Sequence, residues 1–450
     1  MTHEQLSYGA HARGLFRLGV PLIGSFVAGF AIHMTDTIML GWYSVTSLAA
    51  STIAGSLWFI LFILGAGFGQ VVMPLVAEAG ASGDDVRVRR VTRMAMWLSL
   101  IYFAIVIPVF FWSETVLLAV GQTAEVAALG QQYLRIAGFG MAPGLLIVVF
   151  RSYLSGQHLT AVQLWVTLLG VVLNAFINYA LIFGNWGAPE LGIQGAAIAS
   201  VSVQMFTMLF LAGYAQIKLP HFHLFQRIWK SDWPIFWHVF RLGVPIGVTS
   251  LAESGLFVAS SAMMGWIGEI ELAAHGIALQ LVSLMFMFHI GMSQAATIRA
   301  GAAFGKRNIN DLRRGARMAY VISASFGLLC VVLFLAFPSP LISLFIDPTE
   351  PARDELITIG TSLLIVAALF QMADLTQIVS LSLLRGIQDM TVPMWIAAFS
   401  YWVLAIPFSY VMAFTFGFGP EGLWLGLTLG LAVAGLLLTW RFWSEARRLA

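Results

Sequence analysis

The chain has 450 residues, of which 59% are hydrophobic and 10% are charged, and its formal net charge is +2. Soluble domains carry about 25% charged residues, so this composition excludes an ordinary soluble protein and indicates that lipid surrounds much of the chain. The small net charge, without a basic cluster interleaved with aromatic residues, gives no sign of a nucleic-acid partner. Cys330 is the single cysteine, so no internal disulfide can form.

Taken in order, the chain is a succession of apolar runs separated by short polar segments. Each run can cross the hydrocarbon core, which takes roughly 20 residues per helix, and must be helical because unpaired backbone groups are not tolerated in lipid. The first run has no small-residue cleavage pattern, so we expect it to remain as a span. The twelve predicted spans cover residues 15–40, 52–77, 94–113, 129–150, 161–184, 193–215, 237–264, 272–298, 316–337, 356–383, 393–416 and 422–440.

An internal duplication organises these spans. Phe16-Arg17-Leu18-Gly19-Val20-Pro21 recurs 224 positions later as Phe240-Arg241-Leu242-Gly243-Val244-Pro245, and identities such as Trp42 with Trp266 keep the same offset. Matches held at one offset without a gap indicate a repeat. The duplication predicts a first lobe at 1–215, a cytoplasmic linker at 216–236 and a second lobe at 237–450.

The predicted fold class is therefore an all-α integral membrane protein with twelve transmembrane helices in two six-helix lobes. Six is an even number, so both lobes point the same way in the membrane. Two such lobes are expected to be related by a pseudo-twofold axis along the membrane normal, with a cavity between them that suits alternating access.

The basic residues predict the orientation. If the chain changes sides after every span, 21 of the 23 Lys and Arg residues fall on one side, and Arg135 and Arg353 fall on the other. Positive residues stay on the cytoplasmic side. Both termini are therefore expected in the cytoplasm.

Three acidic residues, Asp36, Glu253 and Asp374, lie inside predicted spans. A charge at that depth costs at least ~2.5 kcal/mol, so such residues normally face a cavity or the bundle interior, and function is the default interpretation. The structural alternative is a neutral carboxyl that only ties helices together. In the repeat, Asp36 aligns with Ser260 and Glu253 with Gly29. The carboxyls are not duplicated, and the two lobes need not do the same job.

Polar residues accompany the first-lobe carboxyl. Asn174 and Asn178 are four residues apart and share one helix face, so they could hydrogen-bond to a protonated Asp36. His33 lies one turn before Asp36, and its role as a relay or as hydrogen-bonded filler is left open.

The second-lobe carboxyls have polar neighbours as well. Gln371 and Gln377 lie three residues to either side of Asp374, and a cation stripped of water needs several oxygen ligands. Glu253 and Asp374 together would place two charges close to each other, which suits a shared proton or a bound Na⁺. Two further polar residues could line this lobe, His275 and Gln280.

Four stretches carry a family resemblance. They are Met34-Thr35-Asp36-Thr37-Ile38-Met39-Leu40-Gly41, Pro245 with Glu253 eight residues later, Ala273-Ala274-His275, and Leu384-Arg385-Gly386-Ile387-Gln388-Asp389. In these stretches, and over essentially its whole length, the sequence resembles the multidrug and toxic compound extrusion (MATE) transporters of the NorM-type branch.

The resemblance implies a secondary antiporter and no enzyme. It would export cationic or amphipathic drugs in exchange for H⁺ or Na⁺, with Asp36, Glu253 and Asp374 as coupling residues and no cofactor besides the coupling ion. It also implies a monomer in the lipid of a bacterial inner membrane. Two alternatives stay open: a flippase for lipid-linked precursors, which should need a larger basic cavity, and an intramembrane enzyme, which should need a catalytic pair or metal set across spans.

Overall fold

The computed structural model of the chain describes residues 6–449, and every regular element in that range is a helix. Twelve helical segments are long and apolar enough to cross a membrane, which confirms the predicted all-α fold and the number of spans. The spans are Tyr8–Tyr43 (α1), Val45–Ser82 (α2 and α3), Asp85–Phe111 (α4), Ala124–Gly156 (α6, η1 and α7), Ala161–Phe183 (α8), Ile193–Lys218 (α9), Trp233–Ile267 (α10), Glu269–Gly305 (α11), Ile309–Ala336 (α12), Arg353–Gly386 (α14), Thr391–Thr415 (α15, η4, α16 and η5) and Gly419–Arg448 (α17).

Three of these spans are built from more than one element. Their parts are α2 (Val45–Gln70), α3 (Val72–Ser82), α6 (Ala124–Ala137), η1 (Gly138–Gly140), α7 (Met141–Gly156), α15 (Thr391–Ala398), η4 (Phe399–Ala405), α16 (Ile406–Tyr410) and η5 (Val411–Thr415). Short helices between the spans are α5 (Ser113–Ala119), η2 (Asn185–Gly187), η3 (Pro220–Phe222) and α13 (Pro338–Ser343). Residues 1–5 and 450, the outermost residues of the predicted lobes, lie outside the described residues. The predicted cytoplasmic side of the two termini therefore falls on residues that are not described.

Most helices run beyond the apolar residues from which the spans were predicted. α1 begins at Tyr8 rather than near residue 15, for example. N-cap side chains accept hydrogen bonds from backbone N–H groups in the first turn of some helices. Ser44 accepts one from the Ser47 N–H at the start of α2, and Asp84 accepts one from the Arg87 N–H at the start of α4. Longer helices keep backbone groups paired until the chain has left the hydrocarbon.

The described chain forms two compact units, and their boundaries fall inside helices. Unit 1 comprises Met1–Ile23 and Val248–Ala450, and unit 2 comprises Gly24–Gly247. The start of α1 therefore packs with the second half of the sequence, and the start of α10 packs with the first half. The repeat predicts lobes at 1–215 and 237–450 with a linker at 216–236. These limits describe the two halves of the sequence and stay a prediction.

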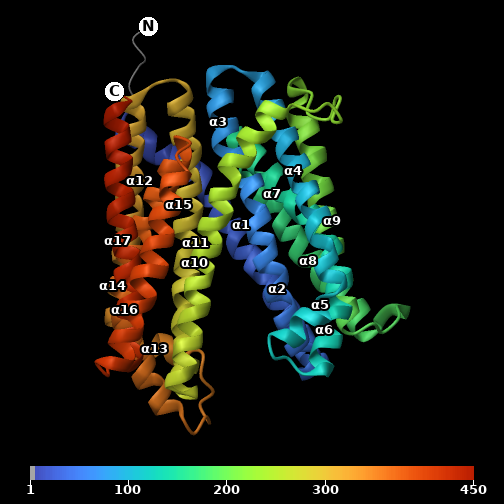
Figure 1. Cartoon of the computed structure of the whole chain (residues 1–450), viewed down its shortest axis with the longest axis vertical. Helices are drawn as coiled ribbons and strands as arrows, with labels where there is room; N and C mark the ends of the chain where they lie inside the picture. Colours follow the sequence, from blue (N-terminus) through green and yellow to red (C-terminus); the bar gives the residue numbers. More distant parts are fainter. Residues whose placement is uncertain (1–5, 450) are drawn as a thin grey trace. The chain divides into compact units, whose positions relative to one another are not determined.

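Each unit has its own central helix. In unit 1, α14 packs against α11, α12 and α17 (Figure 1), and its residues Leu363 and Phe370 belong to the largest apolar core of that unit, together with Trp424. In unit 2, α7 packs against α2, α3, α4 and α9. The helix that carries Asp374 is thus enclosed on several sides by other helices of the same unit.

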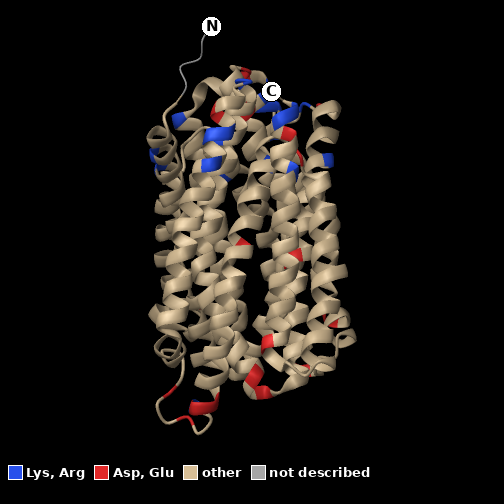
Figure 2. Ribbon diagram, turned by 90° about the vertical axis from the view of Figure 1, so that its left-hand side faces the viewer, with Lys and Arg blue, Asp and Glu red and all other residues tan. Residues whose placement is uncertain are grey.

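Basic side chains are distributed unevenly along the helices. Figure 2 shows Lys and Arg gathered at the end where α17 finishes, whereas Asp and Glu occur at both ends. At the basic end, Arg299 and Asp311 contact His11 from α11 and α12, so the start of α1 is tied to its neighbours by charged groups.

Candidate functional site

The first candidate site lies in unit 2 around Asp36 on α1. The amide nitrogens of Asn174 and Asn178 on α8 donate hydrogen bonds to Asp36 Oδ1 at 2.9 and 2.5 Å. Ser200 on α9 donates to Oδ2 at 3.2 Å. The carboxyl is therefore surrounded by donors from two helices, and its ionised form can be held without water at these positions.

The two asparagines owe their place to helical periodicity. Residues four apart lie on one face of α8, and both side chains are fully buried. Asn178 also donates to the side-chain oxygen of Asn174 at 3.2 Å, which fixes the orientation of both amides. His33, one turn from Asp36 on α1, is exposed and stands outside this buried set.

Two residues of this site do not stand out in the sequence. Ser200 reaches Asp36 from α9, and Tyr133 on α6 packs against the cluster that contains Met39 and Leu40 and interacts electrostatically with Asp36. Each is one polar residue among many on its span, and no spacing within either helix marks it. Only the packing of α9 against α6 and α8 brings them to the carboxyl.

The second candidate site lies in unit 1 around Asp374 on α14. Asp374, Gln371 and Gln377 are all buried, with 2% or less of each residue exposed. Glu253 on α10 and Asp374 are near enough for their charges to interact, and Arg385 at the end of α14 interacts with Glu253 in the same way. The structure thus brings together the two carboxyls and the two glutamines predicted from the sequence.

Hydrogen bonding at the second site is incomplete. The Gln377 amide nitrogen donates to the Tyr401 hydroxyl at 2.7 Å, but the Gln377 side-chain oxygen and both polar atoms of Gln371 have no partner among the described residues. Buried polar atoms without partners are rare and call for an explanation such as a water or an ion. Two carboxyls with two free amide oxygens form an oxygen-rich set of the kind that hard cations prefer.

Tyr401 is a site residue that the sequence does not reveal. It lies on η4, one of two π-helical segments that interrupt the span Thr391–Thr415. Such segments are uncommon and often occur at functional sites. Tyr401 is fully buried and interacts electrostatically with both Glu253 and Asp374.

His275 is held by two fixed partners. The Trp424 indole N–H donates to His275 Nδ1 at 3.0 Å, and Ser261 Oγ lies 3.2 Å from Nε2. The indole nitrogen can only donate, so Nδ1 accepts and carries no proton, which makes the ring neutral with its proton on Nε2. Ser261 accepts that proton while its own hydroxyl donates to the Phe257 carbonyl. Gln280, on the same helix, is half-buried.

Neither site contains a fixed ion pair. Among residues 6–449, no ion pair within 4.0 Å involves Asp36, Glu253 or Asp374. Within the same range, no group of three or more His, Cys, Asp or Glu residues could hold a metal ion. In the described part of the chain, none of the three carboxyls is therefore held in an ion pair.

Comparison with known proteins identifies the family. The MatE family model matches residues 21–180 and 245–411. A protein of Rhizobium meliloti (strain 1021) described as probable multidrug resistance protein NorM is 43% identical over 452 aligned positions, which cover 100% of this chain and 97% of the relative. A protein of Agrobacterium fabrum with the same description is 41% identical over 438 positions, 97% of this chain and 94% of the relative.

Solved structures agree at the level of the fold. The outward-facing conformation of a multidrug resistance MATE family transporter of the MOP superfamily superimposes with a TM-score of 0.88, at 20% identity, over 99% of both chains. At that identity the likeness shows the fold alone. Together with the family model and the close relatives, it shows that the chain is a multi-pass membrane protein that belongs to the MatE family, as its resemblance to the MATE transporters indicates.

Proposed function

We propose that the chain is a secondary antiporter that exports cationic or amphipathic drugs in exchange for H⁺ or Na⁺ by alternating access. The observation that carries the proposal is Asp36, a carboxyl within the span Tyr8–Tyr43 that accepts hydrogen bonds from three polar side chains. Intramembrane carboxyls are costly and mark ion pathways and proton relays. The descriptions of the relatives as probable multidrug resistance proteins support drugs as the cargo.

The drug and the coupling cation would compete for the same negative charge, and this competition would couple their movements across the membrane. An ionised Asp36 attracts a cationic drug, and H⁺ or Na⁺ binding removes that attraction, so the drug is released outside. The carboxyl must lose its cation to the cytoplasm before another drug binds. One charge moving across the membrane supplies ~2.3 kcal/mol per 100 mV, which corresponds to roughly a 40-fold concentration gradient.

The second site would hold a coupling cation or proton in unit 1. Glu253 and Asp374 provide the negative charge, and the partnerless oxygens of Gln371 and Gln377 are available as further ligands. We assign His275 and Gln280 to the wall of this site rather than to cation binding, because both ring nitrogens of His275 are already engaged.

The same proposal places the protein as a monomer in a bacterial inner membrane, with both termini and the segment between α9 and α10 in the cytoplasm. The cytoplasmic placement is supported by the uneven distribution of Lys and Arg, because basic residues in short loops set the orientation of a membrane protein.

Ethidium transport by purified protein in liposomes tests the proposal. We expect an imposed pH or Na⁺ gradient to drive ethidium movement, and Asp36→Asn to reduce it to background while the protein still folds. Asp347→Asn is the matched control, since Asp347 is an exposed carboxyl in the loop between α13 and α14. Full transport by Asp36→Asn would refute the first-site role.

The same liposomes identify the coupling ion. If Na⁺ drives transport, Glu253→Gln and Asp374→Asn should abolish the response to a Na⁺ gradient. If only a pH gradient drives it, the coupling ion is H⁺. Absence of ethidium movement under both gradients, with folded wild-type protein, would overturn the antiporter assignment.

A further inference from the structure

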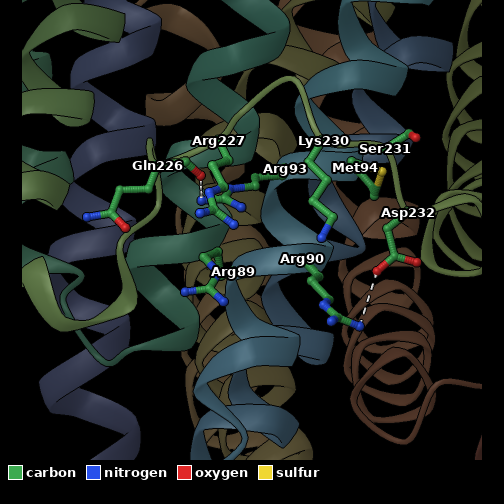
Figure 3. Close-up of a pocket in the computed structure, with 9 residues that line it drawn as sticks. All are labelled: Arg89, Arg90, Arg93, Met94, Gln226, Arg227, Lys230, Ser231 and Asp232. Carbon is green, nitrogen blue, oxygen red and sulfur yellow. Dashed lines mark hydrogen bonds and ion pairs between the residues drawn. The ribbon is translucent and has the colours of Figure 1, made fainter.

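A basic pocket lies in unit 2 and shares no residue with the site around Asp36. It is formed where the start of α4 meets the segment that leads into α10, and it encloses about 250 Å³. A water molecule occupies roughly 30 Å³ in the liquid, so the pocket has room for a group several times that size. Figure 3 shows the lining residues, which are Arg89, Arg90, Arg93, Met94, Gln226, Arg227, Lys230, Ser231 and Asp232.

The lining of this pocket has more cationic side chains than carboxylates to neutralise them. Five cationic side chains face one carboxylate, which leaves a formal net charge of +4. Asp232 pairs with Arg90 at 3.4 Å. Arg89, Arg227 and Lys230 form no ion pair with any residue in the range 6–449, and the Arg89 Nε is buried without a hydrogen-bond partner.

Three of the cationic side chains come from one helix. Arg89 and Arg93 are four residues apart on one face of α4, and the charge of Arg89 acts on Arg93. Arg90 lies beside them on the same helix. An anion bound in the pocket would offset the mutual repulsion of these side chains.

Arg93 shows that the pocket is a built feature. It is 8% exposed, yet the guanidinium bonds only to neutral carbonyl oxygens: Nε donates to Leu224 at 2.7 Å, and Nη2 donates to His223 at 2.7 Å and to Gln226. Buried charges are normally paired. Trp97 likewise donates to the Ile228 carbonyl at 2.9 Å. These bonds fix the segment 223–228 against α4, and in Figure 3 the side chain of Lys230, two residues after that segment, extends towards α4.

We infer that this pocket binds a phosphate group, and that its main source is the headgroup of an anionic phospholipid. Arginine forks match phosphate oxygens in pairs, and three unpaired cations around one cavity suit a group with several acceptor oxygens. The positive-inside pattern puts this end of unit 2 on the cytoplasmic side, where anionic lipids are enriched and basic pockets between helices recognise their headgroups. Bound phosphate would join α4 to the segment that precedes α10.

Native mass spectrometry of the full chain, released from an uncharged detergent, tests the inference. The probes are dioleoyl phosphatidylglycerol, dioleoyl phosphatidylcholine, glycerol 3-phosphate and inorganic phosphate. The test variant is Arg89→Gln/Arg227→Gln/Lys230→Gln, which leaves the structural Arg93 intact. The control variant is Lys306→Gln/Arg307→Gln/Arg447→Gln, which removes the same charge from exposed positions in unit 1.

We expect wild type to bind phosphatidylglycerol more tightly than phosphatidylcholine. The test variant should bind phosphatidylglycerol on the order of 100-fold more weakly, and the control should match wild type. Equally tight binding of glycerol 3-phosphate or inorganic phosphate would support the phosphate site with a soluble source. Lys230→Glu, a change at one exposed side chain, should weaken binding on the order of tenfold if the triple variant does not fold. Equal binding of both lipids, or unchanged binding by a folded variant, would overturn the inference.

Discussion

At the scale of single residues, the two candidate sites differ in how completely their polar side chains are hydrogen-bonded. Asp36 accepts hydrogen bonds from three side chains, whereas at the second site the amide oxygens of Gln371 and Gln377 have no partner among residues 6–449. A buried polar group without a partner costs about 1–3 kcal/mol. The first site can therefore hold a bare carboxylate, while the second gains more from a bound cation or proton.

The hydrogen bonds of His275 give a prediction about stability. Ser261→Ala should leave the His275 Nε2–H buried without an acceptor and lower the free energy of unfolding by about 1–3 kcal/mol. Ser325→Ala is the control, since Ser325 is exposed and donates only to the Val321 carbonyl of its own helix. Thermal unfolding in detergent measures both variants. Equal melting temperatures for the two would show that the Ser261–His275 bond contributes nothing.

At the scale of elements, close helix contacts recur at equivalent positions of the repeat. A Cβ on Gly67 of α2 would lie 2.7 Å from the backbone nitrogen of Gly247 on α10. A Cβ on Gly291 of α11, the repeat equivalent of Gly67, would lie 2.8 Å from the backbone nitrogen of Ile23 on α1. Backbones this close require glycine. The same close helix contact therefore occurs once in each unit, at positions related by the sequence duplication.

Replacing one of these glycines should disturb the packing. Gly67→Ala would force α2 and α10 apart, because the obstructing atoms belong to the backbone, and we expect a loss of about 1–3 kcal/mol in the free energy of unfolding. Gly55→Ala lies on the same helix with nothing within 4 Å of the added methyl group, so it should be neutral or stabilising by up to about 1 kcal/mol. The melting temperatures of the two variants in detergent decide the matter, and an unchanged value for Gly67→Ala would contradict the close-contact interpretation.

At the scale of the whole molecule, the distribution of charge predicts which loops face which side. Apart from Arg353 at the start of α14, the basic residues of unit 1 gather at one end, and the acidic loop between α13 and α14 lies at the other (Figure 2). Cytoplasmic retention of Lys and Arg decides orientation during insertion. The loop between α11 and α12 is therefore expected in the cytoplasm and the loop between α13 and α14 outside.

Cysteine labelling of intact cells checks this orientation. The native Cys330 is fully buried, so a membrane-impermeant maleimide should not label the wild type. Asp347→Cys should be labelled in intact cells, and Lys306→Cys only after permeabilisation, because both positions are exposed but lie in loops predicted on opposite sides. The reverse pattern would show that the protein is inserted the other way round.

The sequence by itself determined the membrane environment, the twelve helical spans, the duplication and the depth of the three acidic residues, because these follow from the length and periodicity of apolar runs. Even the pairing of Asn174 with Asn178 follows from helical spacing. Contacts between separate helices have no such local periodicity. The tertiary structure alone decided that Ser200 reaches Asp36, that Tyr401 joins Gln377, and that the chain segments holding Arg93 and Lys230 meet in one pocket, since those contacts depend on how distant helices pack.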